Sequence, residues 1–360
     1  MKAVVVGAGV FGASSARALA LRDWDVTLVE QYTPGTVRSA SGGDTRLLRA
    51  AHGNVDWYAE LAMRAREQWI ALQEETGVHI FEPVGVAWFA QRANGFEAMS
   101  RTALERLGIP HEWLKPDDAR SLFPSLSTDD LEAVLYEPDA GVLHARRATQ
   151  LLVEDAERRG ATLEIGHPTP RDAPEADIVV WACGAWLPAL FPEQVELTLS
   201  RRDVFFFGAD GAWRGTPGFC DYDAMFYGHG EIAGLGVKVA PDFAGASLDP
   251  DTLDRIPLES RAADARDYAA KRFPSLADAP IVGGRVCQYT LTGDTHFLVA
   301  PHPENPGWWI VGGGSGHGFK HGPALAEYVA DCIEGRCDRE AIHALGPRTG
   351  DAGLRTAAVG

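Results

Sequence analysis

The residues of this sequence that are best suited to carry chemistry are two glycine-rich groups, one at each end of the chain. Near the N-terminus, Gly7, Gly9 and Gly12 follow a short apolar run, residues 3–6, and precede a run of small residues typical of a helix. Glycine at these places permits a tight turn, close approach of the backbone to a pyrophosphate, and close packing of helix on strand. The spacing predicts a dinucleotide site, with the phosphates at the helix N-terminus.

An acidic residue completes this fingerprint. A second β-like run, residues 25–29, ends at Glu30, about 20 residues after the glycines, where a carboxylate can bind a ribose hydroxyl. A glycine turn in an ordinary α/β unit is the alternative. The succession of strand, turn, helix, strand and acid favours the dinucleotide.

The C-terminal glycine run favours a flavin over a nicotinamide. The segment G-G-G-S-G-H-G-F-K-H-G, residues 312–322, lies between an apolar strand, residues 308–311, and a helix, residues 324–333. A nicotinamide enzyme usually needs only the N-terminal fingerprint. A second helix N-terminus directed at the redox ring would stabilise the negative charge of a reduced flavin. We therefore expect FAD rather than NAD.

Composition excludes several function classes. The 360 residues carry 33 Lys and Arg against 50 Asp and Glu, a net charge of −17, which disfavours nucleic acid and anionic membranes as partners. An anionic substrate would need a local basic site. The five cysteines form no C-x-x-C pair, so we expect a reducing compartment and no metal site.

The first twenty residues imitate a signal peptide, but cleavage there would destroy the fingerprint. No apolar run approaches the ~20 residues that span a bilayer. We expect a cytoplasmic protein that is a monomer.

The periodicity predicts an α/β protein of two domains. Helical spacing of apolar residues occurs in residues 58–72, 97–107, 145–159 and 260–272, whereas residues 80–90, 133–136, 161–165 and 178–182 resemble strands. From residue 197 to 241 the pattern is β with little helix, which indicates an antiparallel sheet. The loop from residue 31 to 49 is rich in small and polar residues.

Six segments, taken in order, resemble the FAD-dependent amine and amino-acid oxidoreductases of the D-amino-acid-oxidase superfamily, and within it the branch of monomeric sarcosine oxidase and N-methyltryptophan oxidase. The resemblance extends from Lys2 to about Cys332. The segments are the opening fingerprint with Glu30, G-D-T-R-L-L-R (43–49), A-C-G-A-W (182–186), Tyr227 with G-L-G-V-K (234–238), C-Q-Y-T (287–290) and S-G-H-G-F-K (315–320).

The resemblance implies a Rossmann-like FAD-binding domain of the glutathione-reductase type, interleaved with an antiparallel-sheet substrate domain. The FAD-binding parts would be residues 1–78, 141–194 and 281–345, the substrate parts residues 79–140 and 195–280, and residues 346–360 a loose C-terminal tail.

The resemblance also implies the cofactor site. Cys287 matches a cysteine joined through sulfur to the flavin, although a buried inert thiol would be the default without its context. Arg46 matches a flavin-side arginine, for which a structural ion pair is the alternative. The backbone of His317 should matter more than its imidazole. The residues expected to bind FAD are Gly7, Gly9, Gly12, Glu30, Thr45, Arg46, Gly184, Trp186, Cys287, Gly314, Gly316, His317, Gly318, Phe319 and Lys320.

Five residues are expected to be catalytic by the same resemblance. Lys238 would lie where oxygen is reduced, because a cation placed there stabilises the anion formed by electron transfer to O₂. Arg49 and Lys320 would hold the substrate carboxylate. Tyr227 and Tyr289 would line the substrate cavity, and core packing is the alternative for both. For Lys238, the alternative is a solvated lysine on the surface.

The chain departs from sarcosine oxidase at several places. Gly42 and Asp242 stand where that enzyme has histidines, Asn54 stands where it has an acid, and G-H-G-E follows Tyr227. The catalytic frame is therefore expected to be kept and the substrate to differ from sarcosine.

We thus predict a flavin-dependent oxidation of the C–N bond of a small amino acid or N-methyl amino acid. The imine would be hydrolysed, and O₂ would be reduced to H₂O₂. No side chain is an obvious general base. The alternatives are an FAD-dependent amino-acid dehydrogenase or deaminating oxidase with another electron acceptor, a nicotinamide-dependent dehydrogenase, and a non-catalytic flavin-binding protein.

Overall fold

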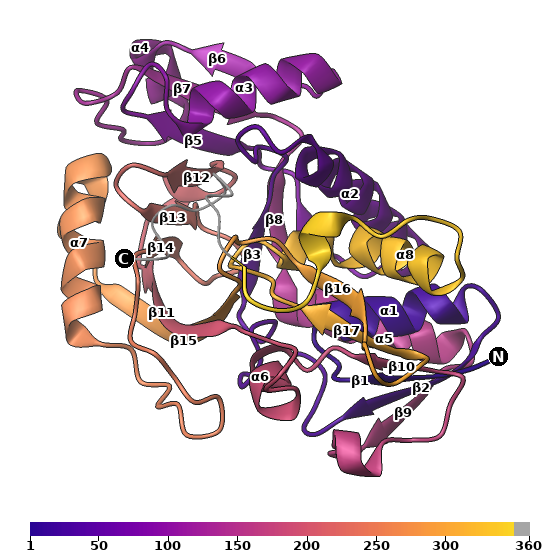
Figure 1. The fold of residues 1–360 in the computed structure, drawn as a ribbon. Coiled ribbons are helices and arrows are strands. Elements are labelled where there is room, and N and C mark those ends of the chain that lie inside the picture. Colours follow the sequence, from indigo (N-terminus) through magenta and orange to yellow (C-terminus); the bar gives the residue numbers. More distant parts are fainter. Residues whose placement is uncertain (349–360) are drawn as a thin grey trace.

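The structure is a computed structural model that describes residues 1–348. Within those residues the strands form three sheets, and several helices lie beside the sheet that contains the N-terminal strand (Figure 1). The predicted α/β class, with a Rossmann-like part and an antiparallel part, is confirmed. The domain boundaries given above stay a prediction.

The parallel sheet contains the fingerprint strand in its interior. The strand order is β16, β17, β10, β1, β2, β9, and all neighbours are parallel except β16 and β17. The turn that follows β1 lies at the carboxyl edge of the sheet, and β2 and β10 flank β1 on opposite sides. This edge is where α/β sheets bind ligands. The bounds are β1 (Lys2–Val6), β2 (Asp25–Glu30), β9 (Thr162–Ile165), β10 (Ile178–Trp181), β16 (Leu298–Pro301) and β17 (Trp308–Gly312).

Both faces of the parallel sheet are covered, as its continuous apolar strands require. Side chains alternate between faces. Val5 packs in the core with the helices, whereas Val4 and Val6 pack with Trp181 and Leu187 on the opposite face. The helices of the first face are α1 (Val10–Ala20), α2 (Asp56–Thr76), α5 (Ala145–Arg158) and α8 (Gly322–Ile333); α6 (Leu187–Leu190) lies on the second.

The large sheet is the predicted antiparallel part. Its strand order is β15, β11, β14, β13, β12, β5, β7, β6, with one parallel pair, β12 and β5. Phe205 and Phe207 of β11 share a core with Ala265 and Ala269 of α7 (Glu259–Arg272). The strands are β5 (Val86–Ala90), β6 (Glu112–Leu114), β7 (Ala133–Glu137), β11 (Thr198–Phe207), β12 (Gly218–Asp221), β13 (Phe226–His229), β14 (Val237–Pro241) and β15 (Ile281–Leu291), and two further helices are α3 (Phe96–Leu107) and α4 (Pro116–Ala119).

A small sheet joins the other two, and the sequence did not predict it. Its order is β3 (Thr45–Leu48), β8 (Gly141–His144), β4 (Phe81–Glu82). Residues 80–90, expected as a strand broken by Pro83 and Gly85, form β4 and β5 on either side of that break, but the two strands belong to different sheets. Residues 45–48 were expected as loop. The prediction was wrong there because pairing with β8, distant in sequence, stabilises four residues that have no strong β pattern of their own.

The last described residues are held, contrary to the expected loose tail. The amide of Gly346 donates to the carbonyl of Gln194, and Arg348 forms an ion pair with Asp294. The rest of that predicted tail lies outside the described residues. Residues 1–348 include no helix that is both long and apolar enough to cross a membrane.

Candidate active site

One cavity is lined by both glycine-rich segments and by residues of the large and small sheets. It encloses about 1940 Å³ free of protein atoms, the solvent at its mouth included. Of the residues predicted for the site, those on its wall are Gly7, Gly9, Glu30, Arg46, Arg49, Gly184, Trp186, Tyr227, Cys287, Tyr289, Gly314, Gly316, His317, Gly318, Phe319 and Lys320. Gly12, Thr45 and Lys238 are not on the wall.

The turn after β1 has the backbone that the fingerprint predicts. Gly7 has φ +99°, and a Cβ there would come within 2.7 Å of the carbonyl oxygen of Ala182. The amide of Ala8 donates to Oε2 of Glu30 (2.7 Å), and the amide of Val10 donates to the hydroxyl of Ser41 (2.9 Å). The N-terminus of α1 and the Glu30 carboxylate therefore share one edge of the cavity, which suits a pyrophosphate and a ribose.

Gly12 allows α1 to pack closely on the turn after β1 and does not contact the cavity. A Cβ at this position would lie 1.8 Å from the carbonyl oxygen of Gly7, so a side chain would push α1 away from the turn. This is the role that the spacing predicts for the third glycine. Gly12 itself is not among the residues that line the cavity.

The C-terminal glycine run brings a second helix N-terminus to the same cavity. It follows β17 and leads through a 3₁₀ turn, Phe319–His321, into α8. A Cβ at Gly322 would come within 2.6 Å of Val10, so α8 crosses α1 in close contact. Two helix N-termini at one cavity fit the phosphates and the redox ring of FAD.

Arg46 and Cys287 meet beside this run. Arg46 lies on β3 and Cys287 on β15, so two sheets supply them. Nη2 of Arg46 donates to Sγ of Cys287 (3.2 Å) and to the carbonyl of Ala40 (2.6 Å). Burial lowers the pKa of Arg46, but Cys287, Tyr227, Tyr289 and Asp44 together outweigh that effect and leave the pKa raised. A charged donor thus points at a thiol on the cavity wall.

Lys238 lies one layer behind the wall. Its Nζ donates to the carbonyl of Thr45 (3.3 Å) and lies 5.1 Å from the ring centroid of Tyr227, which does line the cavity. The side chain is 2% exposed. Burial, together with the charge of Arg46, lowers its pKa to about 7.

Thr45 links Lys238 to a neutral histidine. Nδ1 of His229 must donate to the carbonyl of Gly230 (2.7 Å), so Nε2 accepts from the Thr45 hydroxyl at 2.8 Å. Burial and the charge of Lys238 lower the pKa of His229 to about 3. Thr45 therefore positions Lys238 and does not itself face the cavity.

Arg49 and Lys320 bring two buried cations to one wall. Arg49 follows β3, and Lys320 lies in the 3₁₀ turn before α8. The Arg49 guanidinium donates to the carbonyl of Ala51 and lies 4.6 Å from the ring centroid of Trp88. Nζ of Lys320 donates to the carbonyl of His317 (2.8 Å). A guanidinium and an ammonium on the wall of one cavity are the kind of donors that bind carboxylates in proteins.

Glu137, which the sequence did not single out, fixes the Arg49 segment. Its carboxylate accepts from the amides of Ala50 (2.6 Å) and Ala51 (3.2 Å) and from Nε1 of Trp88 (2.8 Å). Burial raises its pKa against the effect of these hydrogen bonds. No short motif marks Glu137, because it acts from β7, far along the chain.

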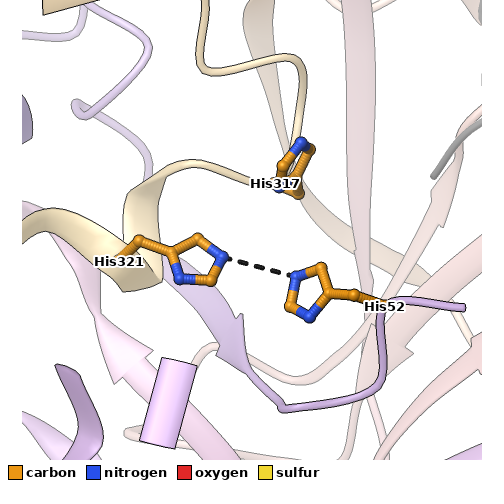
Figure 2. Close-up of side chains that lie close together, drawn as sticks. All are labelled: His52, His317 and His321. Carbon is orange, nitrogen blue, oxygen red and sulfur yellow. Dashed lines mark hydrogen bonds between the residues drawn. The ribbon is translucent and has the colours of Figure 1, made fainter. Parts of the chain in front are cut away.

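His52 and His321 connect the segments that carry the two cations. Nδ1 of His52 donates to the carbonyl of Ala50 (2.8 Å), so its Nε2 accepts from Nε2 of His321 at 3.3 Å. Figure 2 shows the two rings facing each other with His317 beside them. Burial and the charge of Lys320 lower the pKa values of both rings well below 6.5. The pair is thus a neutral hydrogen-bonded bridge.

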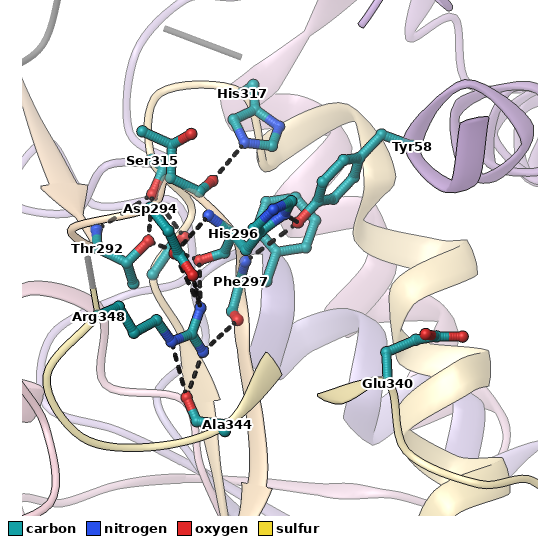
Figure 3. Close-up of polar contacts among 12 residues, drawn as sticks. Tyr58, Thr292, Asp294, His296, Phe297, Ser315, His317, Glu340, Ala344 and Arg348 are labelled. Atoms are coloured by element: carbon teal, nitrogen blue, oxygen red, sulfur yellow. Dashed lines mark hydrogen bonds and ion pairs between the residues drawn. The ribbon is translucent and has the colours of Figure 1, made fainter. Parts of the chain in front are cut away.

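His317 rests on a loop that the C-terminal segment holds in place. Its Nε2 donates to the carbonyl of Thr295 (2.9 Å), and Arg348 donates to Asp294 (3.1 Å) and to the carbonyl of Phe297 (3.0 Å) (Figure 3). The imidazole therefore faces the supporting layer. That the backbone of His317 matters more than its imidazole stays a prediction.

Tyr289 and Asp242 add polar groups to the wall. The Tyr289 hydroxyl donates to Oδ1 of Asp242 (3.0 Å), and the Arg202 guanidinium lies 4.6 Å from the Tyr289 ring centroid. Trp88, Tyr222, Phe226 and Tyr227 give the same cavity aromatic surface. Asp242, noted only as a departure from the family, is therefore part of the site.

Two further departures, Gly42 and Asn54, lie outside the cavity wall. A Cβ at Gly42 would lie 1.8 Å from the carbonyl oxygen of Thr36, so this backbone excludes any side chain there. Asn54 is exposed and is not among the wall residues.

Comparison with known proteins agrees with this geometry. The model of the family described as FAD dependent oxidoreductase matches residues 2–332. The chain is 28% identical over 354 residues to monomeric sarcosine oxidase of Bacillus sp. (strain B-0618), covering 91% of this chain and 90% of that protein. It is 23% identical over 348 residues to N-methyl-L-tryptophan oxidase of Yersinia pestis (strain Pestoides F), covering 91% and 93%.

Solved structures share the fold. L-Proline dehydrogenase from P. horikoshii superposes with a TM-score of 0.83 at 22% identity and covers 95% of each chain. NikD, an amino acid oxidase essential for nikkomycin biosynthesis, superposes with a TM-score of 0.79 at 21% identity and covers 96% of each.

Proposed function

The chain belongs to the family of FAD dependent oxidoreductases, and from this premise we propose that it oxidises the C–N bond of a small amino acid or N-methyl amino acid. The observation that carries the proposal is the pair of buried cations, Arg49 and Lys320, on the wall that also holds Cys287 and the C-terminal glycine run. Relatives named sarcosine oxidase and N-methyl-L-tryptophan oxidase support this substrate class.

The roles of the residues follow from their chemistry. Arg49 and Lys320 bind the substrate carboxylate and so fix the position of the carbon that is oxidised. The aromatic wall, with Trp88 and Tyr227, excludes water from that carbon. The two glycine-rich segments, Arg46 and Cys287 would hold FAD, which would supply the two-electron acceptor; with two electrons and two protons, O₂ would become H₂O₂. Water then hydrolyses the imine to an oxo acid or aldehyde and an amine.

Lys238 and Arg46 supply positive charge where O₂ is reduced. Arg46 lies on the wall and Lys238 directly behind Thr45 and Tyr227. Preorganised cations stabilise an anion as it forms without reorganisation of solvent. We assign the catalytic frame to Lys238, Arg46, Arg49 and Lys320.

Cys287 is the proposed attachment point of the flavin. Its thiol is partly exposed, lies on the cavity wall and receives a hydrogen bond from Arg46. Burial raises the pKa of Cys183, another cysteine on the cavity wall, well above its usual value. The position of Cys287 among Arg46, Tyr289 and the glycine run supports attachment there.

The substrate differs from sarcosine in this proposal. Asp242 gives the cavity wall a carboxylate. A substrate with a hydrogen-bond donor beyond its amine would therefore suit the wall beside Tyr289.

Anaerobic mixing with N-methyl amino acids tests the function. We expect at least one of them to bleach the flavin, and the matched amine without a carboxylate to do so far more slowly. Admitting air should restore the colour and release one H₂O₂ per substrate. Bleaching by neither compound, or by both equally, would contradict the proposal. Slow recolouring in air but fast recolouring with an artificial acceptor would indicate the dehydrogenase alternative.

A further inference from the structure

Within the described residues, two groups of three side chains could each hold a metal ion. The two groups differ in the charge of the residues around them. The first is His52, His317 and His321, shown in Figure 2; the second is His79, Glu82 and His144. The first group is buried beside Lys320 and Arg49, whose positive charges oppose a divalent cation. The second contains a carboxylate and is open to solvent.

We propose that His79, Glu82 and His144 bind a divalent transition metal of the zinc type. Oε1 of Glu82 lies 2.8 Å from Nε2 of His79 and 3.0 Å from Nε2 of His144, and the three ligand atoms all lie within 4.8 Å of one another. In a tetrahedral zinc site with bonds of about 2.0–2.1 Å, ligand atoms are about 3.3–3.5 Å apart. Small side-chain rotations therefore suffice to admit the ion.

The backbone already holds the three ligands in place. Glu82 of β4 pairs with Val142 of β8, and the amide of His144 donates to the carbonyl of Ile80 (2.9 Å). Glu82 and His144 are thus fixed across one antiparallel ladder. His79 lies three residues before Glu82, just after Gly77 ends α2. Little conformational entropy remains to be lost on binding.

Two imidazoles and one carboxylate form a ligand set that zinc sites use, with the fourth position left to water. The His79 side chain is 58% exposed, which gives an ion a path of entry, and the net charge of −17 raises the local concentration of cations.

A bound ion would join the end of α2 to β4 and β8. Since β8 also pairs with β3, which carries Thr45 and Arg46, the ion would stabilise the small sheet beneath the active site. This role is independent of the substrate proposed above.

Titration of chelator-treated, tag-free holoenzyme with Zn²⁺ tests the site. We expect one strong equivalent per chain and a rise in Tm of about 2–5 °C at saturation. His79→Asn and Glu82→Gln should each weaken Zn²⁺ binding by about tenfold or more. His79 is exposed, so His79→Asn leaves the fold intact.

His111→Asn is the matched control. The His111 side chain, 13% exposed, lies 3.9 Å from Glu105 and belongs to neither of the convergent groups. Its replacement should leave Zn²⁺ binding unchanged. No strong equivalent in the parent protein, or equal affinity in the parent, His79→Asn and Glu82→Gln, would overturn the site. The flavin spectrum and amine oxidation are read separately, so failure here is distinguishable from failure of the proposed function.

Discussion

Replacing Lys238 with methionine is expected to slow reoxidation of the reduced flavin by O₂ by about 10²–10³-fold, because the preplaced charge directly behind Thr45 and Tyr227, which would stabilise the developing anion, is lost. Methionine keeps the length and apolar stem of the buried side chain. Reduction of the flavin by substrate should change far less. Stopped-flow measurement of the two half-reactions checks this. Equal slowing of both would remove Lys238 from the oxygen step.

The pH dependence of the same step follows from the lowered pKa of Lys238. Burial, with Arg46, brings that pKa to about 7, so the ammonium is lost as pH rises through this value. The rate of reoxidation should therefore fall between about pH 6 and about pH 9 in the parent protein and stay constant in Lys238→Met.

The same lowered pKa affects stability. Between about pH 7 and 10.5, Lys238 binds fewer protons in the folded state than in the unfolded chain, so the free energy of unfolding of the parent relative to the variant rises with pH.

Replacing Arg49 with alanine is expected to lower kcat/KM for the amino-acid substrate by about 10²-fold or more. A buried charge-assisted contact with the carboxylate is worth about 3 kcal/mol, and every 1.4 kcal/mol is about tenfold. The dissociation constant of a carboxylate inhibitor should rise in parallel. Steady-state kinetics and inhibitor titration of the flavin spectrum measure both.

Two controls separate carboxylate binding from damage to the site. Arg49→Lys keeps the charge but loses the planar fork, so it should recover only part of the affinity. The matched amine without a carboxylate should react almost equally well with the parent and with Arg49→Ala. A loss that is the same for both substrates would show that Arg49 only supports the fold, through Ala51 and Trp88.

The parts of the site that sequence could predict are those in which one residue type is required by local backbone or charge. Gly7 needs its positive φ, and Glu30 ends a strand whose partner carries the fingerprint, so both were predictable from spacing. The family resemblance added Cys287 and Lys320, and both residues lie on the wall of the cavity in the structure.

The parts that sequence could not predict depend on contacts between distant segments. Glu137 reaches the Arg49 segment from β7, and His52 meets His321 across more than half the chain. Strand β3 exists because β8 pairs with it. Lys238 was placed at the cavity, but the structure puts Thr45 and Tyr227 in front of it. Such placements follow from tertiary packing, which leaves no periodic signal.

The attachment of the flavin tests the account most directly. The purified protein and its Cys287→Ala variant would be precipitated with acid, and the visible spectra of pellet and supernatant recorded. We predict that the yellow flavin stays with the parent pellet and moves to the supernatant for Cys287→Ala, whose FAD is held only by the cavity. Colour released from the parent protein would contradict attachment at Cys287, and a colourless protein would contradict the flavin site itself.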